Sequence, residues 1–334
     1  MKRLALLLGT ALALALSGPA LAQSPIVIKF SHVVSPDTPK GKGSIKFKEL
    51  AEKYTNGKAV IEVYPNSQLY KDNEELQALQ LGSVQMLAPS LAKFGPLGVR
   101  EFEVFDLPYI LPDKAALRRV TDGALGKKLF GLLGAKGITG LAYWDNGFKD
   151  MSANKKLLTP ADFRGLKMRI QSSKVLEAQM RALGAIPQVM AFSEVYQALS
   201  TGVVDGTENP PSNEYTQKMH EVQKYTMRSG HGYVGYAVIV NKKFWDGLPA
   251  DIRASLEKAM AEATAFANGA AQQDNDDAIA EMTKSGKTEM VQLTAEQKAE
   301  WRKVLDPVAV EMESRVGKET IAEFRKEAGG SATH

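Results

Sequence analysis

The side chain best suited to ligand chemistry in this sequence is Arg169. It lies in the run Lys167-Met168-Arg169-Ile170, whose alternation of polar and apolar residues predicts a short strand with the arginine near its carboxyl end. In open α/β sheets, ligands bind beyond the carboxyl ends of the strands. A guanidinium group is permanently charged and can hold a carboxylate through two parallel hydrogen bonds. This position therefore indicates a carboxylate anchor, with a solvated surface ion pair as the alternative.

Further polar side chains follow predicted strands or lie close to them. Asn209 comes after a strand and a glycine turn, where its amide could donate to a ligand oxygen, although a plain Asn-Pro turn would also explain it. Lys93 could meet a second carboxylate as a point charge with Ser90 donating beside it, whereas a solvated lysine is the alternative. Lys42 and Lys149 carry the same ambiguity. These five residues are candidate ligand contacts.

Three more candidates lie where predicted strands end. His32 follows the predicted strand at residues 26–30, and the loop that carries it leads into a helix, so this loop lies over the same kind of crevice as Arg169. Trp144 ends another strand, and Asn146 belongs to an Asn-Gly turn that follows it. Trp144 could form the floor of a site, although an aromatic side chain at a strand end more often packs in a core.

Sequence motifs for catalysis, nucleotide binding and metal binding are missing. None of the four histidines has a His-Glu-x-x-His spacing, and a chain without cysteine has no thiol nucleophile and no thiolate ligand. There is no Gly-x-Ser-x-Gly elbow, no phosphate-binding loop and no Gly-x-Gly-x-x-Gly after a strand. We therefore expect no catalytic residue, no metal and no cofactor. The pattern favours a binding function, and an exported enzyme that acts on carboxylates is the alternative.

The first residues have the form of a secretory signal. Lys2 and Arg3 precede an apolar run at 4–16, and Ala20-Leu21-Ala22 forms a cleavage site, which predicts a signal peptide at 1–22 and a protein exported to the periplasm. A retained membrane anchor is the alternative. The net charge of +4 is spread without a basic stripe, which argues against a nucleic-acid partner.

Strand and helix patterns alternate along the rest of the chain, which predicts an α/β fold with mostly parallel strands. Predicted strands cover residues 26–30, 60–64, 138–144, 167–170 and 233–240, and predicted helices cover 44–54, 73–81, 173–183, 191–199 and some thirty residues from Ala250. The pattern Gln77-Ala-Leu-x-x-Gly-x-Val84 returns at residues 197–204. Two equivalent lobes with a cleft between them would explain this repeat, and chance repetition of a common helix ending is the alternative.

Several long runs resemble the periplasmic solute-binding subunit of tripartite ATP-independent (TRAP) transporters. These runs cover residues 165–170, 192–199, 201–210, 221–225 and 241–249. The C4-dicarboxylate-binding branch is resembled in particular by residues 29–34, 38–42 and 90–94. The resemblance covers essentially the whole chain after the signal.

The resemblance implies a two-lobed periplasmic binding protein with mixed, mostly parallel sheets, crossing hinge strands and a long helix that spans both lobes. It places lobe I at residues 23–146 plus 235–274 and lobe II at 147–234 plus 275–334. It makes Arg169 the main salt bridge to the ligand carboxylate and assigns the motif asparagine to Asn209. A second basic position falls on Lys149, where the sialic-acid branch often has arginine. Pro211 stands where the dicarboxylate branch often has tryptophan.

The implied function is the capture of succinate, malate or fumarate by lobe closure, with basic and hydroxyl groups of the other lobe on the second carboxylate. The closed form would be recognised by TRAP membrane subunits, and we expect a monomer without a cofactor. The same kind of receptor for a monocarboxylate, a keto acid, a lactate-like acid or pyroglutamate is the alternative.

Overall fold

The computed structural model describes residues 24–329, so the predicted signal peptide lies outside the described part. The strands are β1 (Ile26–Ser31), β2 (Ala59–Tyr64), β3 (Met86–Leu87), β4 (Ile138–Ala153), β5 (Lys167–Ile170), β6 (Ile186–Val189), β7 (Gly206–Asn209), β8 (Tyr225–Asn241) and β9 (Glu289–Gln292). The helices are α1 (Pro39–Tyr54), α2 (Glu75–Gln80), α3 (Lys114–Asp122), α4 (Ala124–Leu133), α5 (Lys174–Ala182), α6 (Val195–Ser200), α7 (Pro211–Thr216), α8 (Lys242–Asp246), α9 (Ala250–Ser285), α10 (Ala295–Leu305), α11 (Pro307–Glu311), α12 (Glu313–Val316) and α13 (Lys318–Glu327).

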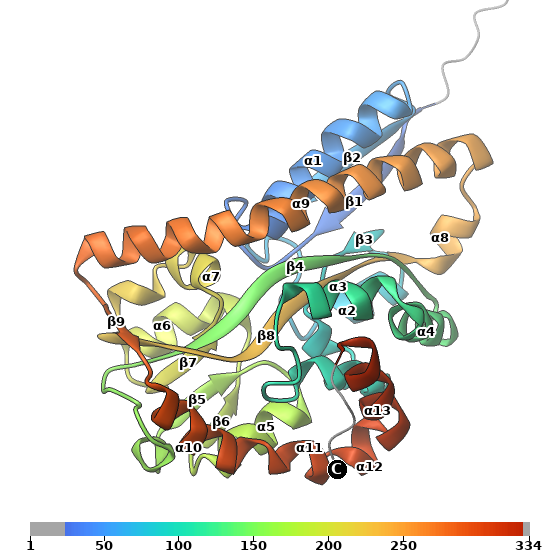
Figure 1. The fold of residues 1–334 in the computed structure, drawn as a ribbon. Coiled ribbons are helices and arrows are strands. Elements are labelled where there is room, and N and C mark those ends of the chain that lie inside the picture. Colours follow the sequence, from blue (N-terminus) through green and yellow to red (C-terminus); the bar gives the residue numbers. More distant parts are fainter. Residues whose placement is uncertain (1–23, 330–334) are drawn as a thin grey trace, which may run out of the picture.

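The strands form one mixed sheet whose two halves are joined by β4 and β8. The strand order is β2-β1-β3-β8-β4-β7-β5-β6, with β9 beside β8. The short strands β1, β2 and β3 of the first half pair in parallel, as do β5, β6 and β7 of the second half. The long strands β4 and β8 pair antiparallel and run from one half to the other (Figure 1). This arrangement confirms the predicted α/β fold with crossing strands.

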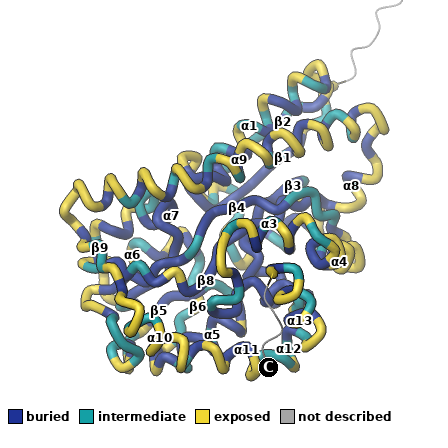
Figure 2. The backbone as a smooth tube through the Cα atoms, viewed as in Figure 1, coloured by how far each residue is buried: buried dark blue, intermediate teal, exposed yellow. Residues whose placement is uncertain are grey.

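Helix α9 lies along both halves, as expected for a lobe-spanning helix (Figure 1). Most of its buried positions recur every three or four residues, and half of them are alanine, which lets the helix approach the sheet closely. Side chains of α9 bind the backbone of β4 near its middle: Asn268 accepts from the Asp145 amide at 2.7 Å, and Asn275 donates to the Asn146 carbonyl at 2.7 Å. The helix is therefore tied to the strand that connects the halves. Its outer face is exposed (Figure 2).

The repeat seen in the sequence has the same local structure in both halves. Helices α2 and α6 each end before a glycine with positive φ, Gly82 at 79° and Gly202 at 72°, and in both cases a strand begins four residues after the glycine. The amides of Ser83 and Val203 each donate to a carbonyl five residues earlier, at 3.0 and 2.9 Å. This left-handed helix ending, which glycine adopts without strain, explains the shared sequence pattern.

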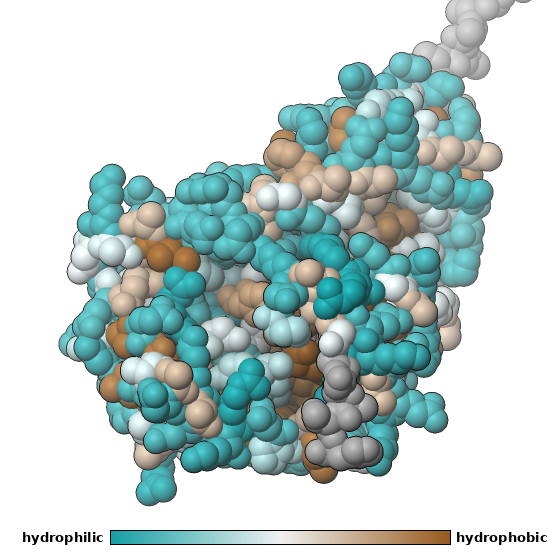
Figure 3. Space-filling view, in the orientation of Figure 1, coloured by the Kyte–Doolittle hydropathy of each residue, from teal (hydrophilic) through white to brown (hydrophobic). Residues whose placement is uncertain are grey.

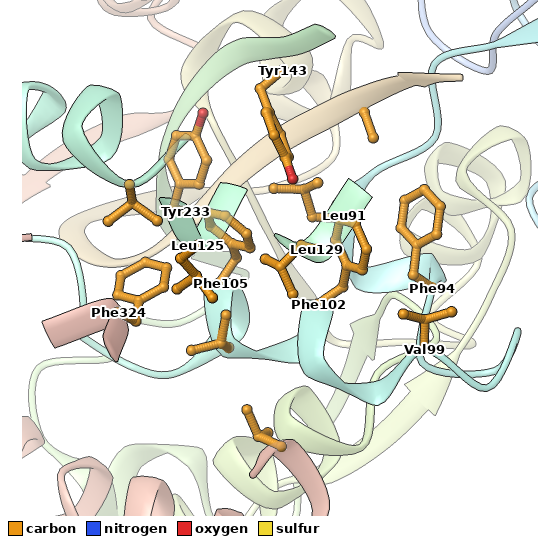
Figure 4. Close-up of a cluster of buried hydrophobic side chains, with 14 of the residues drawn as sticks. Leu91, Phe94, Val99, Phe102, Phe105, Leu125, Leu129, Tyr143, Tyr233 and Phe324 are labelled. Carbon is orange, nitrogen blue, oxygen red and sulfur yellow. The ribbon is translucent and has the colours of Figure 1, made fainter. Parts of the chain in front are cut away.

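The C-terminal helices pack on a core that is built mainly from residues 78–143. Phe324 of α13 contacts Phe105 edge-on, with ring centroids 5.1 Å apart, and Phe105 lies beside Tyr143 of β4 (Figure 4). This core joins segments that the predicted division assigns to different lobes. The division at residues 146–147, 234–235 and 274–275 remains a prediction.

The visible face of the molecule is mainly hydrophilic, with small apolar areas (Figure 3). Among the helices of residues 24–329, none combines the length and the apolar composition that crossing a bilayer requires.

Candidate functional site

A cavity lies between the two halves of the sheet, beyond the carboxyl ends of the short strands. The space between its lining residues is about 290 Å³, which includes volume that is open to solvent. Its lining residues from the first half and β8 are Val33, Val34, Lys40, Asp72, Ser90, Lys93, Val234 and Tyr236, and those from the second half are Arg169, Gln171, Phe192, Asn209 and Asn213. Segments far apart in the sequence therefore meet at the place where α/β folds bind ligands.

Arg169 lines this cavity and is itself buried. Its Nε and Nη2 atoms donate to the Met190 carbonyl at 3.1 and 2.9 Å, and the guanidinium carbon lies 5.6 Å from the centre of the Phe192 ring. Within the described part of the chain, Nη1 has no hydrogen-bond partner. Burial lowers the pKa of Arg169, an effect that Asp72 partly offsets, but a guanidinium keeps its charge in proteins. The backbone contact fixes the orientation of the side chain and leaves Nη1 available to a ligand.

Lys40 is a cavity residue that the sequence interpretation missed. The predicted helix start at residue 44 was too late: Thr38 caps the helix by accepting from the Gly41 amide at 3.1 Å, and Pro39 occupies its first turn. Lys40 is therefore already helical. Its Nζ donates to the Ala88 carbonyl at 2.9 Å and lies 3.7 Å from the centre of the Tyr236 ring. The Thr-Pro pair was the sequence signal for this start, because both residues favour helix N-termini.

The structure does not bring the predicted Lys42 to the cavity. Residues two positions apart point in nearly opposite directions on a helix, so Lys42 leaves the face that carries Lys40. Its side chain is 41% exposed, and its Nζ pairs with Asp274 of α9 at 2.6 Å. Lys42 thus connects two helices on the outside of the molecule.

Lys93 lines the cavity, but its charge is already compensated. Its Nζ lies 2.7 Å from Asp72 and 2.5 Å from Glu75. Burial alone would lower the pKa of Lys93, but these two carboxylates outweigh burial and raise it. For the carboxyl group of Asp72, burial alone would raise the pKa, but the charges of Lys93 and then Arg169 lower it to about 2. Asp72 is therefore charged at neutral pH. In contrast, burial raises the pKa of Glu75.

Asp72 also connects the two halves at the cavity. Its Oδ2 accepts from the backbone amide of Phe192 at 2.7 Å. Nearby, the exposed Lys71 and Glu194 form a second contact between the halves at 2.7 Å. These contacts describe a closed arrangement in which the loop before α2 touches the segment after β6.

Ser90 and Asn209 both line the cavity, as predicted for contacts to a ligand. Ser90 caps the short helix after β3 by accepting from the Ala92 amide at 3.4 Å. The Asn209 amide donates to the Thr207 hydroxyl at 3.3 Å and to the Met219 sulfur at 3.5 Å, both of which are long contacts. Asn146 lies one layer behind the lining, where its amide donates to the Tyr236 hydroxyl at 2.8 Å. Asn146 is thus placed to orient a cavity residue.

Lys149 is buried away from the cavity lining in an ion pair. Its Nζ lies 2.6 Å from Glu208, whose other oxygen is 2.8 Å from His231 Nε2. Burial would raise the pKa of Glu208, but Lys149 outweighs it, with help from His231, and lowers the pKa to about 2. A lysine held in this way is part of the interior of the second half, so the structure does not support a direct ligand contact.

His32 and Trp144 are also packed outside the lining. His32 Nε2 lies 3.2 Å from the Ser44 hydroxyl, and burial, with the nearby charge of Lys40, lowers its pKa to about 3, so the ring is neutral. Trp144 packs in the core beside Phe30 and donates to the Thr264 hydroxyl at 2.8 Å. For Trp144, this is the core role that was the alternative for an aromatic residue at a strand end.

The other missed cavity residues carry little signal in the sequence. They are Asp72, Gln171, Phe192, Asn213 and Tyr236, together with the three valines. Of these residues, only Gln171 could have been predicted from its position at a strand end, because it directly follows β5. No group of three potential metal ligands occurs within residues 24–329. The lining, which is rich in cations, amides and hydroxyls, is suited to binding a small anion.

Substitution of Gly41 by alanine is expected to destabilise the protein by about 1–3 kcal/mol and to weaken ligand binding. An added Cβ would meet the Ser35 carbonyl oxygen and would lie 2.5 Å from Pro36 Cα, which forces backbone next to Lys40 to move. Urea unfolding measures the stability. Gly131→Ala in α4 is the control, because a Cβ there meets nothing within 4 Å. Equal stability of the two variants would contradict this view of the loop.

Comparison with known proteins agrees with this architecture. Residues 30–315 match the family described as bacterial extracellular solute-binding protein, family 7. The chain is 72% identical over 318 residues, 95% of each chain, to the C4-dicarboxylate-binding periplasmic protein DctP of Rhodobacter capsulatus.

Solved structures show the same two-lobed fold. A TRAP periplasmic solute-binding protein of Sulfurospirillum deleyianum, with bound succinate, is 46% identical with a TM-score of 0.88, over 91% of this chain and 99% of that one. Another from Pseudomonas aeruginosa, with bound L-malate, is 43% identical with a TM-score of 0.83, over 86% of this chain and 100% of that one. The chain therefore belongs to the family 7 bacterial extracellular solute-binding proteins.

Proposed function

We propose that this protein is the periplasmic substrate-binding subunit of a TRAP transporter and that it captures a C4-dicarboxylate such as succinate, malate or fumarate. The observation that carries the proposal is the buried guanidinium of Arg169, whose Nη1 has no partner among the described residues, in a cavity closed by both halves. The ligands named for the relatives from Rhodobacter, Sulfurospirillum and Pseudomonas support this choice of acid.

Closure follows from the charge of such a ligand. Burying a dianion is unfavourable unless each carboxylate is paired and its remaining lone pairs accept hydrogen bonds. Arg169 and Asn209 come from the second half, and Ser90 and the lysines come from the first half. Both sets surround the ligand only when the halves are together, so the ligand shifts the equilibrium towards the closed form by its differential affinity.

The closed form is then the state that TRAP membrane subunits would recognise, and the signal sequence at residues 1–22 would direct the protein to the periplasm. In this role the protein has no catalytic step.

A thermal-shift panel, followed by calorimetry, tests the proposal on the purified mature chain. Succinate, malate and fumarate are expected to stabilise the fold, by about 2.7 kcal/mol when the free ligand is at 100 times Kd. Acetate, pyruvate, lactate and pyroglutamate are the comparison set, and NMR of the recovered ligand checks that it is unchanged. Stabilisation by a monocarboxylate alone would replace the proposed ligand, and turnover of any ligand would favour an enzyme.

A further inference from the structure

Three cationic side chains line the cavity, and they differ in how their charge is balanced. Lys93 touches two carboxylates, those of Asp72 and Glu75. Lys40 and Arg169 form no ion pair with any residue in the range 24–329 at a distance of 4.0 Å or less. The cavity therefore presents two uncompensated cations, one from each half of the molecule.

Lys40 is held in place by uncharged groups. Its ammonium group is buried, donates to the Ala88 carbonyl, and lies over the face of Tyr236. An ammonium has three donors, and the Ala88 carbonyl takes one of them. The cation–π contact orients the charge but contributes much less than a close carboxylate would. Lys40 is thus a fixed, buried donor that has capacity for an anion.

We infer that Lys40, and not Lys93, binds the second carboxylate of the ligand and selects dianions over monoanions. This inference rests on the proposed function and makes it more specific. A dicarboxylate would pair its ends with Arg169 and Lys40 at the same time. A monocarboxylate on Arg169 would leave Lys40 buried without an anion, so the protein would gain less from binding it. Lys93 cannot discriminate in this way, because Asp72 and Glu75 already neutralise it.

The surroundings of Lys40 also change its pKa, which gives the inference a second measurable consequence. Burial, and then the charge of Lys93, lowers the pKa of Lys40 to about 7, while Glu75 and Asp72 act in the opposite direction. The other titratable groups around it are His32, which is neutral, and Tyr236. A bound carboxylate raises the pKa of an adjacent ammonium.

Binding of a dicarboxylate should therefore be accompanied by proton uptake at and above about pH 7. The affinity should be greatest below that pH. It should fall by up to about tenfold per pH unit as pH rises above the pKa of the free protein.

Calorimetry of the variant Lys40→Met tests the inference, with succinate and butanoate as ligands. Methionine retains the apolar length of the side chain over Tyr236 and removes its charge. We expect the variant to bind succinate roughly 10²–10³-fold more weakly than the wild type, and to bind butanoate within a few fold of it. Lys42→Met is the matched control, since that residue is two positions away and outside the cavity, and it should bind both ligands like the wild type.

Several outcomes distinguish this inference from the proposed function. If the wild type does not bind succinate, the proposed function fails. If the wild type binds it and Lys40→Met retains the preference for succinate over butanoate, only the role of Lys40 fails. Should Lys40→Met not fold, Lys40→Gln takes its place in the same two titrations: loss of the preference for succinate supports the inference, and retention of that preference overturns it.

Discussion

Replacement of Arg169 by alanine is expected to weaken dicarboxylate binding by about 2–5 kcal/mol, or roughly 30- to 5,000-fold in Kd. The variant would leave one carboxylate of the ligand buried without a positive partner. It would also remove the donors that bind the Met190 carbonyl, so the segment after β6 loses its side-chain contact with β5. Calorimetry with succinate measures the effect, and far-ultraviolet circular dichroism confirms that the variant is folded.

Arg169→Lys is the informative companion variant. It retains the positive charge but loses the planar fork that binds a backbone carbonyl with one edge and a ligand with the other. We expect most of the affinity to be lost in this variant too. Wild-type affinity in Arg169→Lys would show that charge alone is sufficient, and wild-type affinity in Arg169→Ala would exclude Arg169 as the anchor.

Substitution of Glu208 by alanine is expected to lower the free energy of unfolding by about 3–5 kcal/mol. The variant would leave Lys149 buried without its carboxylate, and it would remove the partner of His231 Nε2. Denaturant unfolding measures the loss. Asp246→Ala is the control, because Asp246 forms an exposed ion pair with Lys242 that contributes little. A Glu208 variant as stable as the Asp246 variant would contradict a structural role for the buried pair.

The same carboxylate gives a pH dependence with a definite sign. The pKa of Glu208 is lowered from 4.5 to about 2 in the folded protein, chiefly because Lys149 outweighs burial. A carboxyl group whose pKa is lower in the folded than in the unfolded protein stabilises the fold at pH values above the unfolded pKa. This contribution is lost as pH falls from about 4.5 to about 2. The wild type should therefore lose stability in this window more steeply than Glu208→Ala, as measured by denaturant unfolding at a series of pH values.

The residues that the sequence identified best are those whose role depends on local geometry. Arg169 and Asn209 follow from strand alternation and the strand-end rule, and both line the cavity. The helix endings at Gly82 and Gly202 follow from a backbone conformation that glycine favours. In each case the evidence lies within a few residues of the position concerned.

The remaining features depend on facts that a single sequence does not contain. The choice of Lys42 over Lys40 followed from placing the helix start five residues too late, so the face towards the cavity could not be assigned. In the sequence, Lys149 is as good a candidate ligand contact as the other lysines. Only the folded structure shows that it pairs with Glu208, which is 59 residues away. The contact of Asp72 with Phe192 spans 120 residues and forms only when the halves meet. Local sequence patterns do not show which distant residues will be in contact.

A crystal structure of the mature protein with succinate would show directly which side chains hold the two carboxylates. We expect one carboxylate within hydrogen-bond distance of Arg169 Nη1 and the other within hydrogen-bond distance of Lys40 Nζ, in the cavity between the two halves. Succinate bound elsewhere, or bound in this cavity without contact to Arg169, would contradict it.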